Sequence, residues 1–320
     1  MRAVVFAYHD IGYVCLRELV RQGHEVVAVF THEDDPGEEI WFRSVPTLAR
    51  ELGLLTLTPP DPNTPEYLEL IRGLQPDIGF SFYYRYMLKA PLLDIPPLGC
   101  LNLHGSYLPK YRGRCPVNWV LVNGETETGV TLHYMVEKPD AGDIVAQRRV
   151  PIAFEDTART LYAKMTATAE ALFAETLPLL AAGTAPRVPM DLSQGSYYGG
   201  RRPADGRFEW TWPALRIYNL VRAVTHPYPG AFVGSPDGDL FVWWACPVPA
   251  PSPSAETAPG TIVALTPEGP VVMTGQDCLL LLQVQPPLQP ELSGIEFARL
   301  RRLAVGQNLA ADHETGTDPA

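Results

Sequence analysis

An amide and an imidazole stand two residues apart in this chain, at Asn102 and His104. The apolar run 98–103 is bounded by proline and glycine, which predicts a short buried strand. Side chains two apart on a strand point to the same face, so the pair is expected to project together at the strand's end. An amide donor beside an imidazole suits a tetrahedral intermediate that carries a negatively charged oxygen.

Asp140 offers a third group, because it opens the run Asp140-Ala141-Gly142-Asp143 downstream of the pair. A carboxylate beside His104 would favour the protonated imidazole through its opposite charge. Imidazole titrates near neutrality, so His104 could give a proton to a departing nitrogen. Taken alone, His104 could instead be a core residue whose polar atoms are hydrogen-bonded within the protein. Asp140 alone could be a turn residue before Gly142.

Several runs of the sequence resemble the folate-dependent formyltransferases. Residues 102–113 and 140–143 are similar to the signature that the whole family shares. A more particular similarity, to the members that formylate UDP-4-amino-4-deoxy-L-arabinose, is carried by residues 4–10, 30–32, 36–38, 81–85, 118–133 and 229–232. The resemblance extends over residues 1–305, nearly the whole chain.

The resemblance implies an N-formyltransferase that moves a formyl group from 10-formyltetrahydrofolate to the 4-amino group of a sugar nucleotide. Its most specific implication is UDP-4-amino-4-deoxy-L-arabinose as the acceptor, in lipid A modification and polymyxin resistance. It assigns the catalytic roles to Asn102, His104 and Asp140. It also implies a set of folate-binding residues, in part through main-chain groups: Tyr86, Met87, Leu88, Arg114, Val136, Glu137, Lys138, Pro139 and Asp140.

Basic residues alternate along the segment that follows His104, at Lys110, Arg112 and Arg114. Charge runs of this kind are usually solvated loops. Next to a catalytic strand, the same cluster could instead hold folate carboxylates or the diphosphate of a sugar nucleotide.

The segment Tyr8-His9-Asp10-Ile11-Gly12 follows the first expected strand, where a Rossmann fold carries its phosphate loop. It lacks G-x-G-x-x-G, so a dinucleotide cofactor is not expected. Tyr8 and His9 are candidate contacts of the sugar nucleotide, with a local helix cap as the alternative for His9. Arg201 and Arg202 are further candidates because arginine recognises phosphate well, although a loop charge pair explains them equally.

The composition of the chain limits which kinds of partner, metal site and cellular location are expected. The 320 residues carry a net charge of −11, which argues against a broad nucleic-acid interface. Five cysteines show no metal-type spacing, and no zinc motif is present, so no metal is expected. An odd number of cysteines, no signal-like N-terminus and no long apolar run predict a cytoplasmic protein without a membrane span.

Strand patterns alternate with helix patterns in the first two thirds of the chain, which predicts an α/β, Rossmann-like, mainly parallel sheet. Evenly spaced short strands follow, which predict a smaller C-terminal β-barrel of OB-like type. The expected domains are a catalytic domain at 1–203, a β-barrel domain at 204–305 and a disordered tail at 306–320.

Three alternatives to this function remain. Methionyl-tRNA formyltransferase shares the folate machinery, although the net acidity and the acidic residues 33–35 disfavour tRNA binding. A different UDP- or dTDP-aminosugar is a second alternative for the substrate. A non-catalytic module that binds folate or a sugar nucleotide is the third, and the complete Asn102, His104 and Asp140 set argues against it.

Overall fold

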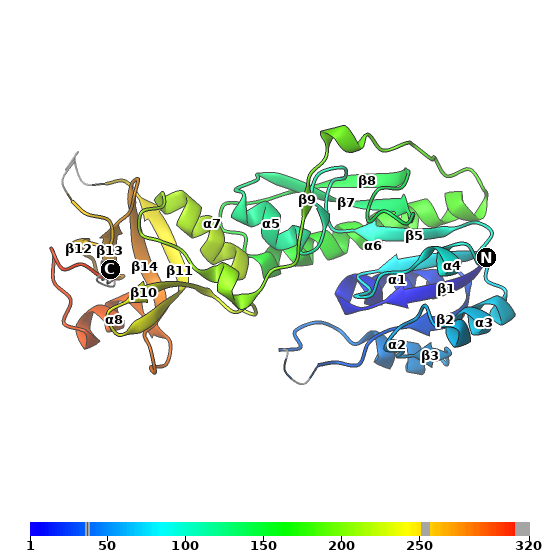
Figure 1. Cartoon of the computed structure of the whole chain (residues 1–320), viewed down its shortest axis with the longest axis horizontal. Helices are drawn as coiled ribbons and strands as arrows, with labels where there is room; N and C mark the ends of the chain where they lie inside the picture. Colours follow the sequence, from blue (N-terminus) through cyan, green and yellow to red (C-terminus); the bar gives the residue numbers. More distant parts are fainter. Residues whose placement is uncertain (36, 38, 251–256, 311–320) are drawn as a thin grey trace, which may run out of the picture. The chain divides into compact units, whose positions relative to one another are not determined.

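The computed structural model describes residues 1–320 except 36, 38, 251–256 and 311–320. The described chain forms two compact units (Figure 1). Unit one contains Met1–Val117, Thr126–Phe154 and Thr160–Gly200. Unit two contains Asn118–Glu125, Glu155–Arg159 and the described residues from Arg201 onward.

Unit one is built on one mainly parallel sheet, with the strand order β3-β2-β1-β4-β5-β7-β8. Strands β1 to β5 pair in parallel, whereas β7 pairs antiparallel with both β5 and β8. The strands are β1 (Arg2–Ala7), β2 (Glu25–Phe30), β3 (Thr56–Leu57), β4 (Ile78–Phe82), β5 (Cys100–His104), β7 (Glu127–Tyr134) and β8 (Ile144–Pro151). The strand order reverses between β1 and β4, which is where open α/β sheets bind their ligands.

Helices cover both faces of this sheet, as expected of a doubly wound fold. One face packs Val4 and Phe6 of β1 against buried residues of α3 and α4. On the other face, the rings of Phe80 and Phe82 lie 5.2 and 5.0 Å from the ring of Phe173 on α6. The helices of unit one are α1 (His9–Arg21), α2 (Val45–Glu51), α3 (Pro65–Leu74), α4 (Ala90–Leu93) and α6 (Ala158–Ala181), whereas most of α5 (Pro116–Val122) belongs to unit two.

A two-stranded ribbon fixes the segment that follows β5. Strand β6 (Arg112–Gly113) pairs in parallel with β9 (Tyr197–Tyr198). The segment before unit two therefore supplies a strand to this ribbon. The short 3₁₀ turns η1 (Leu192–Gln194) and η2 (Pro203–Gly206) flank it.

Unit two contains an antiparallel sheet with the strand order β10-β11-β14-β13-β12, and β15 pairs with β14. Helix α7 packs on this sheet, with the rings of Tyr218 and Trp244 5.8 Å apart. The elements are α7 (Ala214–Val224), β10 (Ala231–Ser235), β11 (Gly238–Val248), β12 (Ile262–Leu265), β13 (Pro270–Met273), β14 (Cys278–Gln285), β15 (Leu292–Ser293) and α8 (Gly294–Leu300).

The predicted fold class is confirmed: a mainly parallel sheet with helices, and a separate antiparallel β unit. The division of the chain at residue 203 stays a prediction. Residues 311–320 of the expected disordered tail lie outside the described residues. The first part of that tail is hydrogen-bonded into unit two, because the amide of Leu309 donates to Gly260 and the amide of Ile262 donates to Gln307.

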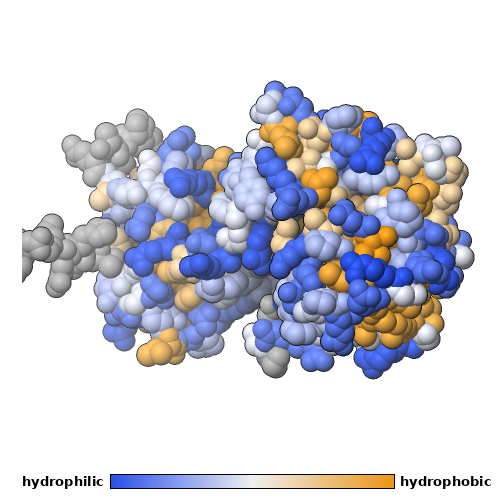
Figure 2. Space-filling model, turned by 45° about the vertical axis from the view of Figure 1, so that its right-hand side comes forward, coloured by the Kyte–Doolittle hydropathy of each residue, from blue (hydrophilic) through white to orange (hydrophobic). Residues whose placement is uncertain are grey.

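The surface mixes residues of both kinds. On the face shown in Figure 2, groups of hydrophobic residues are set among hydrophilic ones. Within the described part of the chain, no helix has both the length and the apolar character to cross a membrane.

Candidate active site

The end of β5 and the facing part of β7 bring an amide and two imidazoles together. In the antiparallel pairing of these strands, Asn102 lies directly opposite His133. The Nδ2 atom of Asn102 lies 3.3 Å from Nε2 of His133. The Nδ1 atom of His133 lies 2.8 Å from the carbonyl oxygen of Tyr134, which can only accept a hydrogen bond. His133 therefore donates from Nδ1, and its Nε2 can accept from the amide of Asn102.

Asp140 joins this pair to His104. Its Oδ1 lies 3.3 Å from Nδ2 of Asn102, 3.5 Å from Nε2 of His133 and 3.6 Å from Nδ1 of His104. The backbone amide of Gly113 donates to Oδ2 at 2.8 Å. The three residues for which the sequence suggests catalytic roles thus lie at one place, around one carboxylate.

The charge of Asp140 is maintained by its surroundings. Burial alone would raise the pKa of this carboxyl group. The opposing effects are the nearby imidazoles, that of His104 first, and the hydrogen bond from the Gly113 amide, which together hold the pKa well below its usual value. Asp140 is therefore an anion at neutral pH.

Both ring nitrogens of His104 face an acceptor. Its Nε2 lies 2.8 Å from the carbonyl oxygen of Tyr111, so this nitrogen carries a proton in the hydrogen bond. Its Nδ1 faces the Asp140 carboxylate at 3.6 Å. Only 6% of the surface of His104 is exposed, so water competes little for either nitrogen. This arrangement accommodates the doubly protonated ring, with Asp140 as its counter-ion.

Unusual backbone conformations bring the loops to these side chains. Asp140 and Tyr111 adopt positive φ angles of 49° and 58°, which non-glycine residues rarely do. Gly142 lies so close to the carbonyl of Tyr134 that a Cβ atom would clash with its oxygen. The glycine in the Asp-Ala-Gly-Asp run therefore lets the loop fold back and present Asp140. Strain of this kind is typical of functional sites.

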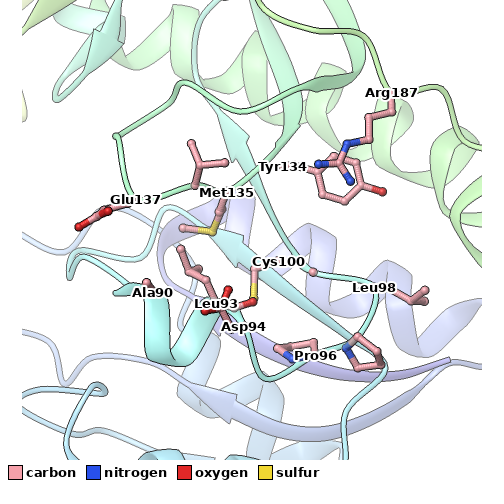
Figure 3. Close-up of a pocket in the computed structure, with 13 residues that line it drawn as sticks. Ala90, Leu93, Asp94, Pro96, Leu98, Cys100, Tyr134, Met135, Glu137 and Arg187 are labelled. Atoms are coloured by element: carbon pink, nitrogen blue, oxygen red, sulfur yellow. The ribbon is translucent and has the colours of Figure 1, made fainter.

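A pocket of about 510 Å³ opens beside β5, two residues before Asn102 (Figure 3). Its volume lies in the range of small-molecule sites. Figure 3 shows that α4, the turn before β5 and the segment after β7 form its walls. The lining residues are Ala90, Leu93, Asp94, Pro96, Pro97, Leu98, Gly99, Cys100, Tyr134, Met135, Val136, Glu137 and Arg187. Val136 and Glu137 belong to the expected folate set, whereas the other lining residues do not.

The remaining members of the expected folate set are not among the residues that line this pocket, and they differ in how far their side chains are exposed. Tyr86 and Met87 are 43% and 54% exposed, whereas Leu88 is buried. The Asn63 side chain holds this segment, because it donates to the carbonyl of Met87 and accepts from the amide of Lys89. Lys138 and Arg114 are exposed, and Pro139 is half-buried.

Tyr8 and His9 lie at the carboxyl end of β1, among aromatic rings. The His9 ring stacks on Phe42 at 3.7 Å and meets the edge of Tyr162 at 4.6 Å. Burial, followed by the charge of Arg85, lowers the pKa of His9 to about 3. The hydroxyl of Tyr8 donates to Asp34, and the guanidinium of Arg85 lies over the Tyr8 ring. Burial and the charge of Arg85 thus keep the His9 ring neutral, and no carboxylate is among the groups that shift its pKa.

Arg201 and Arg202 belong to unit two. Arg201 lies over the ring of Trp119 and donates to the carbonyl of Asp205. The amide of Arg202 donates to the Asp205 side chain in the turn η2. Their role as substrate contacts stays a prediction. Within the described residues, no group of three or more His, Cys, Asp or Glu side chains is placed to hold a metal ion.

His133 is the member of this cluster that sequence reasoning missed. Its alternation with Thr131 along an apolar run was the available signal, since it places His133 on one face of a strand. Which residue of β5 it would oppose depends on the register between β5 and β7, and the pattern of a single strand does not fix that register.

Two family models match this chain. Residues 1–177 match "Formyl transferase", and residues 201–302 match "Formyl transferase, C-terminal domain". The first match alone covers more than half of the 320 residues.

Solved structures show the same fold at low identity. The N-formyltransferase from Helicobacter canadensis, in complex with folinic acid and dTDP-3-aminofucose, is 20% identical, with a TM-score of 0.69 over 88% of this chain and 97% of that chain. WlaRD, a sugar 3N-formyl transferase, is 17% identical, with a TM-score of 0.65 over 91% and 99%.

A sugar N-formyltransferase from a Shewanella species is 20% identical, with a TM-score of 0.61 over 76% of this chain and 96% of that chain. At these identities the likeness establishes the fold. Together with the two matched family models, it shows that the chain belongs to the formyl transferase family.

Proposed function

We propose that the protein transfers a formyl group from 10-formyltetrahydrofolate to the amino group of a sugar nucleotide. The observation that supports this most strongly is the cluster in which one ionised Asp140 lies within 3.6 Å of atoms of Asn102, His104 and His133. An amide, an imidazolium and its counter-ion are the groups that an amine formylation uses.

The neutral amine attacks the formyl carbon, and the carbonyl oxygen gains negative charge as the new carbon–nitrogen bond forms. His104 and Asn102 stabilise this oxygen by donating hydrogen bonds. The carbon–N10 bond of the folate then breaks, and the departing nitrogen takes a proton from His104. The proton that the amine loses restores the imidazolium, so charge and protons balance over one turnover.

The donors of this site are engaged before substrate arrives. The Nδ2 hydrogens of Asn102 are directed at Asp140 and His133. A bound oxyanion would therefore replace one of these contacts, whereas Nε2 of His104 would exchange the Tyr111 carbonyl for substrate. This exchange keeps the side chains in place between turnovers, which lowers the cost of organising the site.

The pocket beside β5 is our candidate for the pterin end of the folate. It has apolar walls from Leu93 and Met135, and polar groups at its rim from Asp94 and Glu137 (Figure 3). The amides of Met87 and Leu88, for which no partner is found within the described residues, could add the main-chain hydrogen bonds. Two of the structural relatives were solved with folinic acid or 5-N-formyl-tetrahydrofolate, which supports a folate donor here.

The crevice between the ends of β1 and β4 is our candidate for the sugar nucleotide. It is the point at which the strand order reverses, and Tyr8, His9 and Arg85 lie there. Aromatic rings can stack on a base or a sugar, and the Arg85 guanidinium suits a phosphate. Relatives solved with dTDP-3-aminofucose or dTDP support a nucleotide-linked aminosugar as acceptor.

The specific acceptor we propose is UDP-4-amino-4-deoxy-L-arabinose, which would place the protein in lipid A modification and polymyxin resistance. The support for this choice is the sequence similarity in residues such as 8–10 and 81–85.

A substrate panel tests the proposal. Purified protein and 10-formyltetrahydrofolate are incubated with UDP-4-amino-4-deoxy-L-arabinose, other UDP- and dTDP-aminosugars, and methionyl-tRNA, and the products are identified by mass spectrometry. We expect the highest kcat/KM with the UDP-4-amino-4-deoxy sugar. A preference for another aminosugar would correct the acceptor, and formylation of methionyl-tRNA alone would reject the proposal.

A further inference from the structure

Arg112 is a buried cation whose side chain has no hydrogen-bond or ion-pair partner among the described residues, and it lies next to the candidate catalytic residues in the chain. Only 9% of its surface is exposed, whereas Lys110 and Arg114, its neighbours in the basic cluster, are exposed. Within the described residues, no carboxylate forms an ion pair with its guanidinium, and its buried Nε has no hydrogen-bond partner. The middle member of the cluster is therefore not the solvated loop residue that a charge run usually indicates.

The backbone on either side of Arg112 is tied to the catalytic groups. The carbonyl of Tyr111 accepts the hydrogen bond from His104, and the amide of Gly113 donates to Asp140. Arg112 therefore stands in the chain between the two contacts that position the imidazole and its counter-ion.

The same segment is held from its other side by β9. The amide of Arg112 donates to the carbonyl of Ser196 at 3.0 Å, and the amide of Arg114 donates to Tyr198 at 3.0 Å. The rings of Tyr111 and Tyr198 stack at 5.0 Å. The backbone of Arg112 thus sits on a ribbon held by these contacts, and a preorganised backbone lowers the entropic cost of recognising a ligand.

A buried arginine without a counter-ion costs folding free energy. Guanidinium stays protonated in proteins, so it cannot escape this cost by losing its charge. Removing a charged group from water is unfavourable unless an opposite charge and hydrogen bonds replace the lost hydration. Since the described part of the chain supplies neither to Nε of Arg112, a bound oxyanion is the natural complement, and the planar guanidinium matches phosphate and carboxylate groups.

We propose that Arg112 binds an oxyanion group of a substrate and thereby positions that substrate at the His104 and Asp140 site. This rests on the proposed function, which offers two sources of such a group: the diphosphate of the sugar nucleotide and the glutamate carboxylates of the folate. Arg112 is a binding residue in this account, and the chemical step belongs to His104.

The test compares Arg112→Met with wild type and with Arg72→Gln, which removes an exposed arginine that pairs with Glu69 on α3. Thermal unfolding is measured first without ligand and then with UDP or folinic acid, and a Kd is determined for each. Because Arg112→Met removes an unpaired buried charge at similar volume, we expect an unliganded Tm equal to or above that of wild type. One of the two ligands should bind about tenfold to a hundredfold more weakly.

The outcomes separate the two sources. Weaker UDP binding with unchanged folinic acid binding identifies the diphosphate, and the reverse identifies the carboxylate. Arg112→Lys, which keeps the charge but loses the planar fork, should lie between wild type and Arg112→Met for the same ligand. Arg72→Gln should match wild type with both ligands.

Three results would overturn the inference. One is a marked loss of the unliganded Tm in Arg112→Met, which would show that Arg112 supports the fold. The others are unchanged Kd values for both ligands, and equal weakening of both, which indicates a disturbed site. Product formation by wild type is scored separately, so a failure of the proposed function is recognised independently of these Kd values.

Discussion

Two of the histidine environments in unit one, at the ends of β5 and β1, differ in their neighbouring charges and hydrogen bonds. At the end of β5, His104 and His133 share the carboxylate of Asp140, and the other nitrogen of each ring is bonded to a backbone carbonyl. At the end of β1, His9 is packed against aromatic rings, and its Nδ1 has no hydrogen-bond partner within the described residues. The first environment places a carboxylate beside the rings, whereas burial in the second favours the neutral form of His9.

This difference suggests different functions for two places along the carboxyl edge of the sheet, one at β5 and one at β1. Proton transfer by an imidazole is helped by a carboxylate counter-ion, and Asp140 lies 3.6 Å from Nδ1 of His104. Burial and the charge of Arg85, which lower the pKa of His9 to about 3, make that ring a neutral wall for stacking or for accepting a hydrogen bond. Chemistry is therefore expected near β5 and recognition near β1.

The largest expected effect on activity comes from the site around Asp140 at the end of β5. His104→Ala removes the proton donor and one oxyanion donor, so kcat should fall by at least about 10²-fold. His9→Phe, the matched change at the end of β1, should alter KM for the sugar nucleotide more than kcat. Steady-state kinetics of both variants test this contrast, and a near-normal kcat in His104→Ala would remove His104 from the mechanism.

Asp140→Asn should have the next largest effect. The amide cannot stabilise an imidazolium, so kcat/KM should fall by at least about tenfold. The amine must be neutral and His104 protonated, which gives wild type a bell-shaped pH profile that belongs to the coupled site. In the variant the shape of this profile should change, because His104 has lost its counter-ion. An unchanged rate and profile would show that Asp140 is structural.

His133→Leu should produce a smaller loss. It removes the acceptor that fixes the Asn102 amide at 3.3 Å, which is a contact between neutral groups. Such a hydrogen bond contributes about 1 kcal/mol, so a decrease in kcat of about fivefold is expected, with KM little changed. His133→Asn, which can still accept from Asn102, is the control and should recover part of the activity. Equal losses in both variants would argue against a positioning role.

The smallest effect concerns stability rather than turnover. Because the folded pKa of His9 lies near 3 and the usual value is 6.5, the unfolded chain binds the proton first as pH falls. The stability that neutral His9 provides is complete above pH 6.5 and is lost towards pH 3, with a slope approaching about 1.4 kcal/mol per pH unit. His9→Gln should show a flatter decline in urea unfolding between these pH values. A slope equal to that of wild type would mean that His9 titrates normally.

The sequence predicts the framework of this site better than its details. The alternation of strand and helix patterns correctly predicts a mainly parallel sheet with helices, because buried parallel strands are strongly apolar. The two-residue spacing of Asn102 and His104 predicts that their side chains project together, and both lie near Oδ1 of Asp140. Asp140 joins them through a loop with a positive φ, a conformation that no periodic pattern specifies.

Other features depend on contacts between distant segments. The opposition of His133 to Asn102 is a matter of strand register, and the burial of Arg112 depends on the ribbon formed with residues 197–198. Lys110, Arg112 and Arg114 look equivalent in the sequence, yet only Arg112 is buried. Tertiary packing decides such differences, and local composition does not record it.

The central claim is that the β5 site performs formyl transfer to an aminosugar. The most direct measurement supplies 10-formyltetrahydrofolate with a ¹³C-labelled formyl group and UDP-4-amino-4-deoxy-L-arabinose, and follows the label by ¹³C NMR in wild type and His104→Ala. We predict that the label appears in an N-formyl sugar nucleotide with wild type, and at a rate at least about 10²-fold lower with His104→Ala. Label that stays on the folate with wild type, or equal transfer by the two proteins, would contradict the account.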